Sequence, residues 1–201
     1  EAGNVVLGAS CLNEGKQIFE QVYWNNLPVL DKVVVHAPLQ CGRISTSISQ
    51  IASAAQSQAF LNIEAESDGV VRHYPLFLKT EKGHHPSFAL GIAAVAEPEM
   101  MNTSFEDDNG YAGHVLLRTI PRKNFLTLSA SDLLEGDQLS LSVRQILQNR
   151  IVLVGVSALG TEDFYRDAVN EDIPGVFLHA TATLNILDQI SIHSKDADGL
   201  H

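Results

Sequence analysis

The residues best suited to bind a ligand stand in a short charged segment, ESDGVVRHYP, at residues 66–75. Gly69 supplies the backbone freedom that a tight turn requires. Asp68 can accept hydrogen bonds from the backbone of that turn, and Arg72 offers a planar guanidinium that can hold a carboxylate. We expect Asp68 and Arg72 to bind each other or the turn, and contact with a ligand is the alternative.

Two further candidates lie near the C-terminal end of the chain. Asp163 follows the apolar run at residues 151–156, where open α/β sheets place their binding crevices. The alternative for Asp163 is a loop acid that caps local backbone. His179 stands at the start of an apolar helix, just after Pro174 and Gly175. For His179, a hydrogen-bonded histidine of the core or of an interface is favoured over a ligand contact.

Motifs for nucleotide binding, catalysis and metal binding are incomplete. The glycines at 155 and 160 have the G-x-x-x-x-G spacing but lack the Lys-Ser/Thr of a phosphate-binding loop, so a structural turn after a buried strand is favoured. Ser157 lacks the second glycine of a hydrolase nucleophile elbow. A hydrolase that uses Ser157 or Asp163 with His179 is kept as an alternative. The histidines show no H-x-x-x-H or H-E-x-x-H spacing, so we expect no metal and no cofactor.

Composition favours one domain with a substantial core. The chain has 201 residues, of which 45% are apolar, and we place the domain at residues 1–192 with a frayed tail at 193–201. Thirteen basic against 24 acidic residues give a net charge of −11, which argues against nucleic-acid partners and anionic lipid. No apolar run is long enough to cross a bilayer. Cys11 and Cys41 can form one bridge in an oxidising compartment or remain buried thiols.

Strands and helices alternate along the chain, which predicts an α/β fold. We expect a layered α/β/α domain with a mixed, largely parallel sheet and one antiparallel hairpin. The predicted strands are residues 4–8, 31–36, 114–120 and 151–156, and the predicted hairpin pairs residues 59–65 with 70–79 around the Asp-Gly turn. The predicted helices are a stripe within 43–60, a helix at 86–96 capped by Ser87, a short turn at 129–134 and a helix at 176–190. For residues 43–60, a loosely ordered loop with partial helix is the alternative.

Taken together, these segments resemble the second CHASE family, the cyclase- and histidine-kinase-associated sensory extracellular domains. The resemblance covers about residues 60–187. Its acid-x-Asp-Gly-Val-x-Arg corner is matched by Glu66, Asp68, Gly69, Val70 and Arg72, and its Pro-Ser-Phe-Ala-Leu helix start by residues 86–90. Residues 129–136 correspond to a Ser-x-x-Asp-Leu-Leu-x-Gly turn, and residues 151–155 with Asp163 to a strand and its loop. Residues 174–180 match the block Pro-Gly-Val-x-x-His-Ala.

Two departures from the family pattern matter for the site. The family's opening strand and helix are not found, so we expect the chain to begin partway through the family's domain. An unpaired strand edge would then pair with another copy of the chain. The loop after Gly155 reads Ser-Ala-Leu-Gly-Thr-Glu-Asp, whereas the family has Thr-Ala-x-Gly-Leu-x-Asp.

The resemblance implies a sensory module rather than an enzyme. Such a module forms the extracytoplasmic part, periplasmic or extracellular, of a bacterial inner-membrane receptor and adjoins that receptor's membrane helices. Its output module would be an adenylate or diguanylate cyclase, a histidine kinase or a phosphodiesterase. We expect a homodimer and an unknown small-molecule or environmental cue. Asp163 and His179 are then the candidate contacts for the cue, and Asp68 and Arg72 are clamps or part of the pocket rim. A structural dimerisation spacer is a further alternative.

Overall fold

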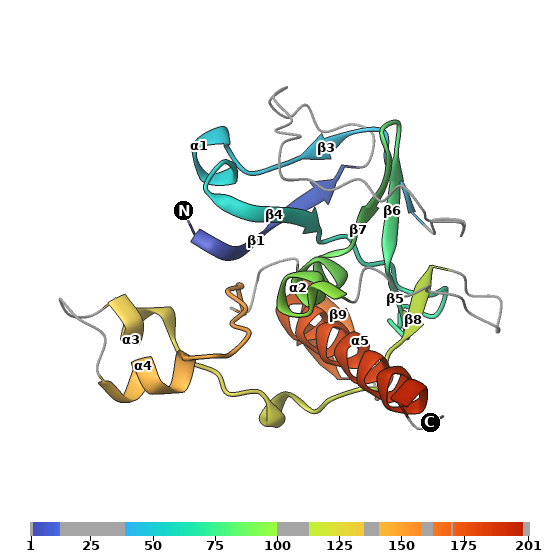
Figure 1. Ribbon diagram of the computed structural model, residues 1–201. Coiled ribbons are helices and arrows are strands. Elements are labelled where there is room, and N and C mark those ends of the chain that lie inside the picture. Colours follow the sequence, from blue (N-terminus) through green and yellow to red (C-terminus); the bar gives the residue numbers. More distant parts are fainter. Residues whose placement is uncertain are drawn as a thin grey trace.

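Four small sheets contain the strands of the computed structural model, which describes residues 2–12, 39–99, 113–134, 141–157, 163–169 and 171–198. In the first sheet, β1 (Ala2–Cys11) lies between β3 (Ile44–Ser45) and β4 (Ala55–Phe60). In the second, β6 (Phe77–Thr80) lies between β2 (Leu39–Gln40) and β7 (Gly83–Pro86). The remaining two are pairs: β5 (His73–Pro75) with β8 (His114–Leu116), and β9 (Phe164–Arg166) with β10 (Asp172–Pro174) (Figure 1).

The α/β class predicted from the sequence is confirmed, but the largely parallel sheet is wrong for the described residues. Only β1–β4 and β2–β6 are parallel, whereas β1–β3, β5–β8, β6–β7 and β9–β10 are antiparallel. The connections explain this difference. Two residues, Glu81 and Lys82, join β6 to β7, and so short a link cannot form the crossover that parallel strands require.

The antiparallel hairpin predicted around the Asp-Gly turn does not form. β4 pairs with β1, and the chain after β4 continues along β1, because the Leu61 amide donates to the Ala9 carbonyl at 2.8 Å. Asn62 extends this contact with its side chain, which binds the backbone N–H and C=O of Cys11 at 2.6 and 3.0 Å. Because residues 61 and 62 are bonded to β1, they do not pair with β5 as the predicted hairpin requires, and β5 pairs with β8.

A continuous helix within residues 43–60 is also wrong, whereas the partial helix of the alternative is present. This region contains β3, the four-residue helix α1 (Ser49–Ala52) and β4. Ile48 and Ile51, two members of the stripe, are exposed. Serine, threonine and glutamine give the segment a weak helix propensity, so pairing of β4 with β1 overrides it.

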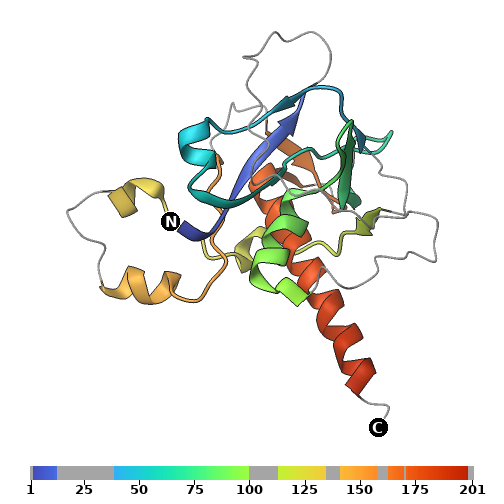
Figure 2. The ribbon, with the colours of Figure 1, turned by 45° about the horizontal axis from the view of Figure 1, so that its top comes forward.

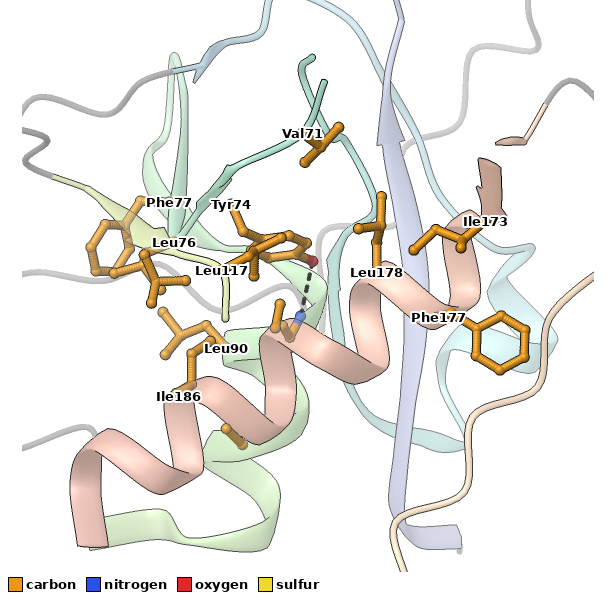
Figure 3. Packing of buried hydrophobic residues seen from close by; sticks show 14 residues of the cluster. Val71, Tyr74, Leu76, Phe77, Leu90, Leu117, Ile173, Phe177, Leu178 and Ile186 are labelled. Atoms are coloured by element: carbon orange, nitrogen blue, oxygen red, sulfur yellow. Dashed lines mark hydrogen bonds between the residues drawn. The ribbon is translucent and has the colours of Figure 1, made fainter. Parts of the chain in front are cut away.

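Two helices build the core. α2 (Phe88–Ala96) begins after Ser87, which occupies the predicted N-cap position, and contacts β1, β4 and β7 as well as α5 (Gly175–Asp198). Figure 3 shows the apolar side chains that α5 and the β5 region bury between them. A second, smaller cluster contains Ala9, Cys41, Phe60 and Leu78. Further short helices are α3 (Ala130–Leu134), α4 (Leu141–Leu147) and the 3-10 helix η2 (Arg122–Asn124).

The strongest strand predicted from the sequence, residues 151–156, forms no strand with the described part of the chain. Most of its side chains are exposed, and no described strand pairs with it. The strand predicted at 31–36 lies outside the described residues. The one at 114–120 is confirmed in its first three residues as β8.

A disulfide joins Cys11, the last residue of β1, to Cys41, just after β2. Of the two possibilities that the sequence left open, the structure therefore has the bridge. α5 is the longest described helix, and Figure 2 shows its C-terminal half extending away from the other elements. None of the helices in the described ranges combines the length and the apolar composition that crossing a membrane requires.

Candidate functional site

The charged corner, residues 66–73, is a turn closed by both backbone and side chains. The Gly69 amide donates to the Glu66 carbonyl at 2.8 Å, and Gly69 has a φ of +80°, a conformation that glycine adopts without strain. Asp68 accepts a hydrogen bond from the Val70 amide at 3.1 Å. The prediction that Asp68 binds the turn is therefore confirmed.

Arg72 is held between two carboxylates of this corner. Its two terminal nitrogens donate to Glu66 at 2.6 Å and to Asp68 at 2.8 Å. The second oxygen of Glu66 accepts a hydrogen bond from Nδ1 of His73 at 2.7 Å. These contacts make Arg72 a structural clamp, as one of the two predictions for it stated.

The electrostatics of the corner favour the charged forms of Glu66, Asp68 and Arg72. Hydrogen bonds from His73 and then from Arg72 lower the pKa of Glu66. Arg72 lowers the pKa of Asp68, with a smaller contribution from the Val70 amide, and both acids raise the pKa of Arg72. Because these side chains are solvent-accessible, the ion pairs fix geometry and add little to stability.

The corner is attached to β9 through the backbone. Val70 forms a β-bridge with Arg166, and the Val71 amide donates to the Arg166 carbonyl at 2.8 Å. The turn after β9 is closed by the buried Asp167, whose Oδ1 accepts hydrogen bonds from the amides of Val169 and Glu171, each at 3.0 Å. β9 therefore carries the corner at its C-terminal end.

Asp163 lies at the other end of β9, beside the first residue of α5. Its carbonyl accepts a hydrogen bond from the Gly175 amide at 3.0 Å, and its carboxylate lies so close to Gly175 that a Cβ there would be 2.5 Å from Oδ1. Among the described residues the carboxylate has no hydrogen-bond partner, and partial burial raises its pKa. The negative charge in turn contributes to the raised pKa of Tyr165, although burial of Tyr165 is the larger cause.

His179, one turn further along α5, points into the core. The residue is 7% exposed, with Nδ1 2.7 Å from the hydroxyl of Tyr74 in β5 and the Phe88 ring edge-on at 5.3 Å between ring centroids. Burial lowers the pKa of His179 to about 4, so the ring is neutral at physiological pH. The Ala89 amide already donates to the Tyr74 oxygen at 3.3 Å (Figure 3), so we assign the hydroxyl proton to the bond with His179.

The four predicted site residues therefore fall into three places. Asp68 and Arg72 are bonded to each other at the corner. Asp163 is three residues before Arg166, which corresponds to about 10 Å of extended chain. His179 is in the core, the location that the sequence favoured for it, and does not share the surface of the other three.

Sequence reasoning missed Tyr74 as the partner of His179. The two residues are 105 positions apart, and Tyr74 reads as an ordinary apolar strand residue. It also missed the role of His73 in the clamp. The signal for that role was present, because a histidine directly after an acid-rich turn and an arginine can reach the same carboxylate.

The residues of the hydrolase alternative are not assembled. Nδ1 of His179 is occupied by Tyr74, and Ser157 is exposed and makes no hydrogen bond with His179 within the described ranges. A nucleophile needs its base within hydrogen-bond reach. Within the same ranges, no three His, Cys, Asp or Glu side chains lie close enough together to hold a metal ion.

Comparison with known proteins gives one match. The family described as the CHASE2 domain matches residues 4–200, which is essentially the whole chain. No curated protein and no solved structure matches the chain. The family match includes the charged corner, the loop of Asp163 and the helix of His179. The chain therefore belongs to the CHASE2 domain family, a family of extracellular sensory domains of signalling proteins rather than of catalytic domains.

Proposed function

We propose that this domain is the signal-input part of a bacterial membrane receptor whose cytoplasmic output module is a cyclase, a kinase or a phosphodiesterase. Its place is the periplasmic or extracellular side of the inner membrane. Family membership supports this proposal. The disulfide between Cys11 and Cys41 supports it independently, because such bridges persist in oxidising compartments and are rare in the cytosol.

The cue contacts the surface formed by β9 and the segments at its two ends. Asp163 is the group available for this contact, because the residue is exposed and its partly buried carboxylate has no hydrogen-bond partner among the described residues. Asp68 and Arg72 already satisfy each other, so they shape the rim and keep the corner rigid. A polar or cationic cue fits a surface whose unpaired group is an acid.

The cue's effect reaches α5 through two consecutive residues of β5. Successive side chains of a strand point to opposite faces. His73 accordingly faces the corner and binds Glu66, whereas Tyr74 faces the core and binds His179. This link is the observation that carries the proposal. A cue that shifts the corner moves β5, and β5 then changes the packing of α5, which favours one of two states of the receptor.

The test compares signalling with stability in the full-length receptor. Tyr74→Phe removes the hydroxyl that bonds His179 and keeps the ring. Ile186→Val, a matched control, removes one methyl group from the same helix and costs about 1 kcal/mol without touching the link. Output is measured as second-messenger production or autophosphorylation, and stability is measured as the thermal midpoint of the purified domain.

We expect Tyr74→Phe to change basal or cue-dependent output, while Ile186→Val leaves output unchanged at a similar loss of stability. His179→Ala should likewise alter output more than it alters folding. If output falls in all three variants only in proportion to the thermal midpoint, the link does not transmit a signal.

A further inference from the structure

Residues 151–156 are called the unpaired strand here because their composition predicts a strand that does not form in the described chain, and they are its most unusual surface. Their sequence, IVLVGV, is rich in β-branched residues that favour strands. Yet Val154 is 92% exposed, and Ile151, Val152 and Val156 are also exposed. Within the described ranges, no backbone hydrogen bond is formed by this segment. An apolar strand sequence left in solvent without pairing marks an interaction site.

The unpaired strand is held in place from one side. At Gly155 it lies directly against the first turn of α5, where a Cβ would be 2.6 Å from the Cβ of Val176. Only glycine permits this close approach. The segment is therefore fixed at Gly155 while Val152, Val154 and Val156 remain open to solvent.

We propose that the unpaired strand is the interface between two copies of this chain, which pair it antiparallel across a two-fold axis. A two-fold interface uses the same patch on both copies, so the patch must be complementary to itself. The segment meets this condition, because apolar residues would face apolar residues along its whole length. It also contains no charge and no proline, the residues that protect edges from such pairing.

The charges at the two ends of the segment favour antiparallel pairing. They also favour a second copy of this chain as the partner. The segment is preceded by Arg144 and Arg150 and followed by Asp163. Antiparallel pairing brings the basic end of one copy toward the acidic end of the other, whereas parallel pairing would place like charges together. The chain as a whole carries −11, so copies repel one another over most of their surface. Residues 141–150, directly before the unpaired strand, contain these two arginines and no acid, so this stretch is locally basic and reduces that repulsion.

The inference is tested by the oligomeric state of the 201-residue chain, measured by light scattering and sedimentation between about 1 and 100 µM. We expect a dimer in this range. Val154→Lys places two ammonium groups near the two-fold axis and should raise the dissociation constant at least about 100-fold. Leu126→Lys is the matched control, since Leu126 is an equally apolar, exposed residue outside the segment, and it should leave the dimer intact.

A second measurement covers the case in which Val154→Lys disturbs folding. The two native cysteines are joined, so Val154→Cys adds a single free thiol. Near a two-fold axis, this thiol should link two copies covalently under mild oxidation, whereas Leu126→Cys should not. A chain that stays monomeric at 100 µM, or a dimer that survives Val154→Lys and does not cross-link through Val154→Cys, overturns the proposal.

Discussion

Two buried polar side chains of α5 bind partners outside the helix, and together they fix how this helix sits in the core. His179 binds Tyr74 and Asn185 binds the backbone of Arg118, whereas Thr183 donates to the His179 carbonyl within α5 at 2.8 Å. A buried polar group costs stability unless its hydrogen bonds are satisfied. Such contacts therefore allow one register of α5 and penalise others, a property that an apolar helix face alone does not provide.

Asn185 should be the most sensitive of these positions. Its side-chain oxygen accepts from the Arg118 amide at 2.6 Å, and its nitrogen donates to the carbonyls of Arg118 and Thr181 at 3.2 and 2.8 Å. Asn185→Leu leaves the amide and carbonyl of Arg118 without these side-chain partners at a part-buried position. We expect a loss of about 1–3 kcal/mol in the free energy of unfolding, measured by urea denaturation.

Asp188→Ala is the control, because Asp188 binds the same arginine in a different way. Its carboxylate pairs with the exposed guanidinium of Arg118. Exposed ion pairs contribute between 0 and about 1 kcal/mol. Equal losses in the free energy of unfolding for Asn185→Leu and Asp188→Ala would contradict this prediction. They would show that the contact of Asn185 with the Arg118 backbone contributes no more than the exposed ion pair.

The buried His179 should make stability depend on pH. Burial lowers its pKa to about 4 in the folded protein, from an unfolded value of about 6.5. A base with a lowered pKa contributes stability that is full above the unfolded pKa and is lost as pH falls toward the folded one. Between pH 7.5 and 5 this loss amounts to about 2 kcal/mol.

Chemical denaturation at these two pH values in the natural chain and in His179→Gln measures this contribution. The range lies above the lowered pKa values of Glu66 and Asp68, so these acids stay ionised. Other histidines contribute equally to both proteins and cancel. The difference between pH 7.5 and 5 should be smaller in His179→Gln by about 2 kcal/mol. An unchanged difference would mean that His179 is protonated without penalty.

At the level of elements, the contact between α2 and the β1–β4 sheet depends on a glycine inside the helix. A Cβ at Gly91 would lie 2.7 Å from the Cβ of Ala59 in β4 and 3.6 Å from Val6 in β1. Ala59 is fully buried and cannot move away as a flexible side chain could. The helix thus accepts a residue of low helix propensity in order to approach the sheet closely.

Gly91→Ala should therefore destabilise the domain, although alanine favours a helix by about 1 kcal/mol. Overpacking costs about 1–3 kcal/mol, so we expect the thermal midpoint to fall. The double change Gly91→Ala with Ala59→Gly should recover part of the loss, since it returns the space. Gly42→Ala, where nothing lies within 4 Å, serves as the control. A rise in the midpoint for Gly91→Ala would contradict this account of the contact.

The sequence predicted those elements whose signals are local. α2 has an N-cap serine and an apolar face, and α5 has a Pro-Gly start and a long apolar run, so both were placed within a few residues at their N-terminal ends. β1 was predicted from its β-branched residues. Residues 43–60 were assigned wrongly because their apolar spacing fits a helix, whereas pairing of β4 with β1 decides their structure.

The distinction between local sequence signals and tertiary packing also applies to the candidate site. The bond between Asp68 and Arg72 spans four residues and follows from turn chemistry. The bond between Tyr74 and His179 depends on how β5 and α5 pack, which no local pattern encodes. Residues 151–156 differ from both of these bonds, because their local signal is clear but the structure it predicts is not formed within the described residues. Their composition predicts a buried strand, but burial requires a partner, and the described chain supplies none.

For the molecule as a whole, two apolar clusters must be held together. The larger contains α2, α5 and β5, and the smaller surrounds Phe60 and Leu78. The smaller cluster has few members, so its own burial stabilises it weakly. Cys41 belongs to it, and the disulfide ties it to the end of β1. The bridge therefore reinforces the part of the domain with the least apolar packing.

Removing this bridge should destabilise the whole domain. It closes a loop with a sequence separation of 30 residues, for which the chain-entropy model gives about 3–4 kcal/mol. We expect a thiol reductant to lower the denaturation midpoint of the natural chain, and the variant carrying both Cys11→Ser and Cys41→Ser to match the reduced chain and to show no response to the reductant. If the reduced and oxidised chains unfold at the same denaturant concentration, the smaller cluster does not depend on the disulfide. The contribution of the disulfide to stability would then no longer support the proposal of an oxidising compartment.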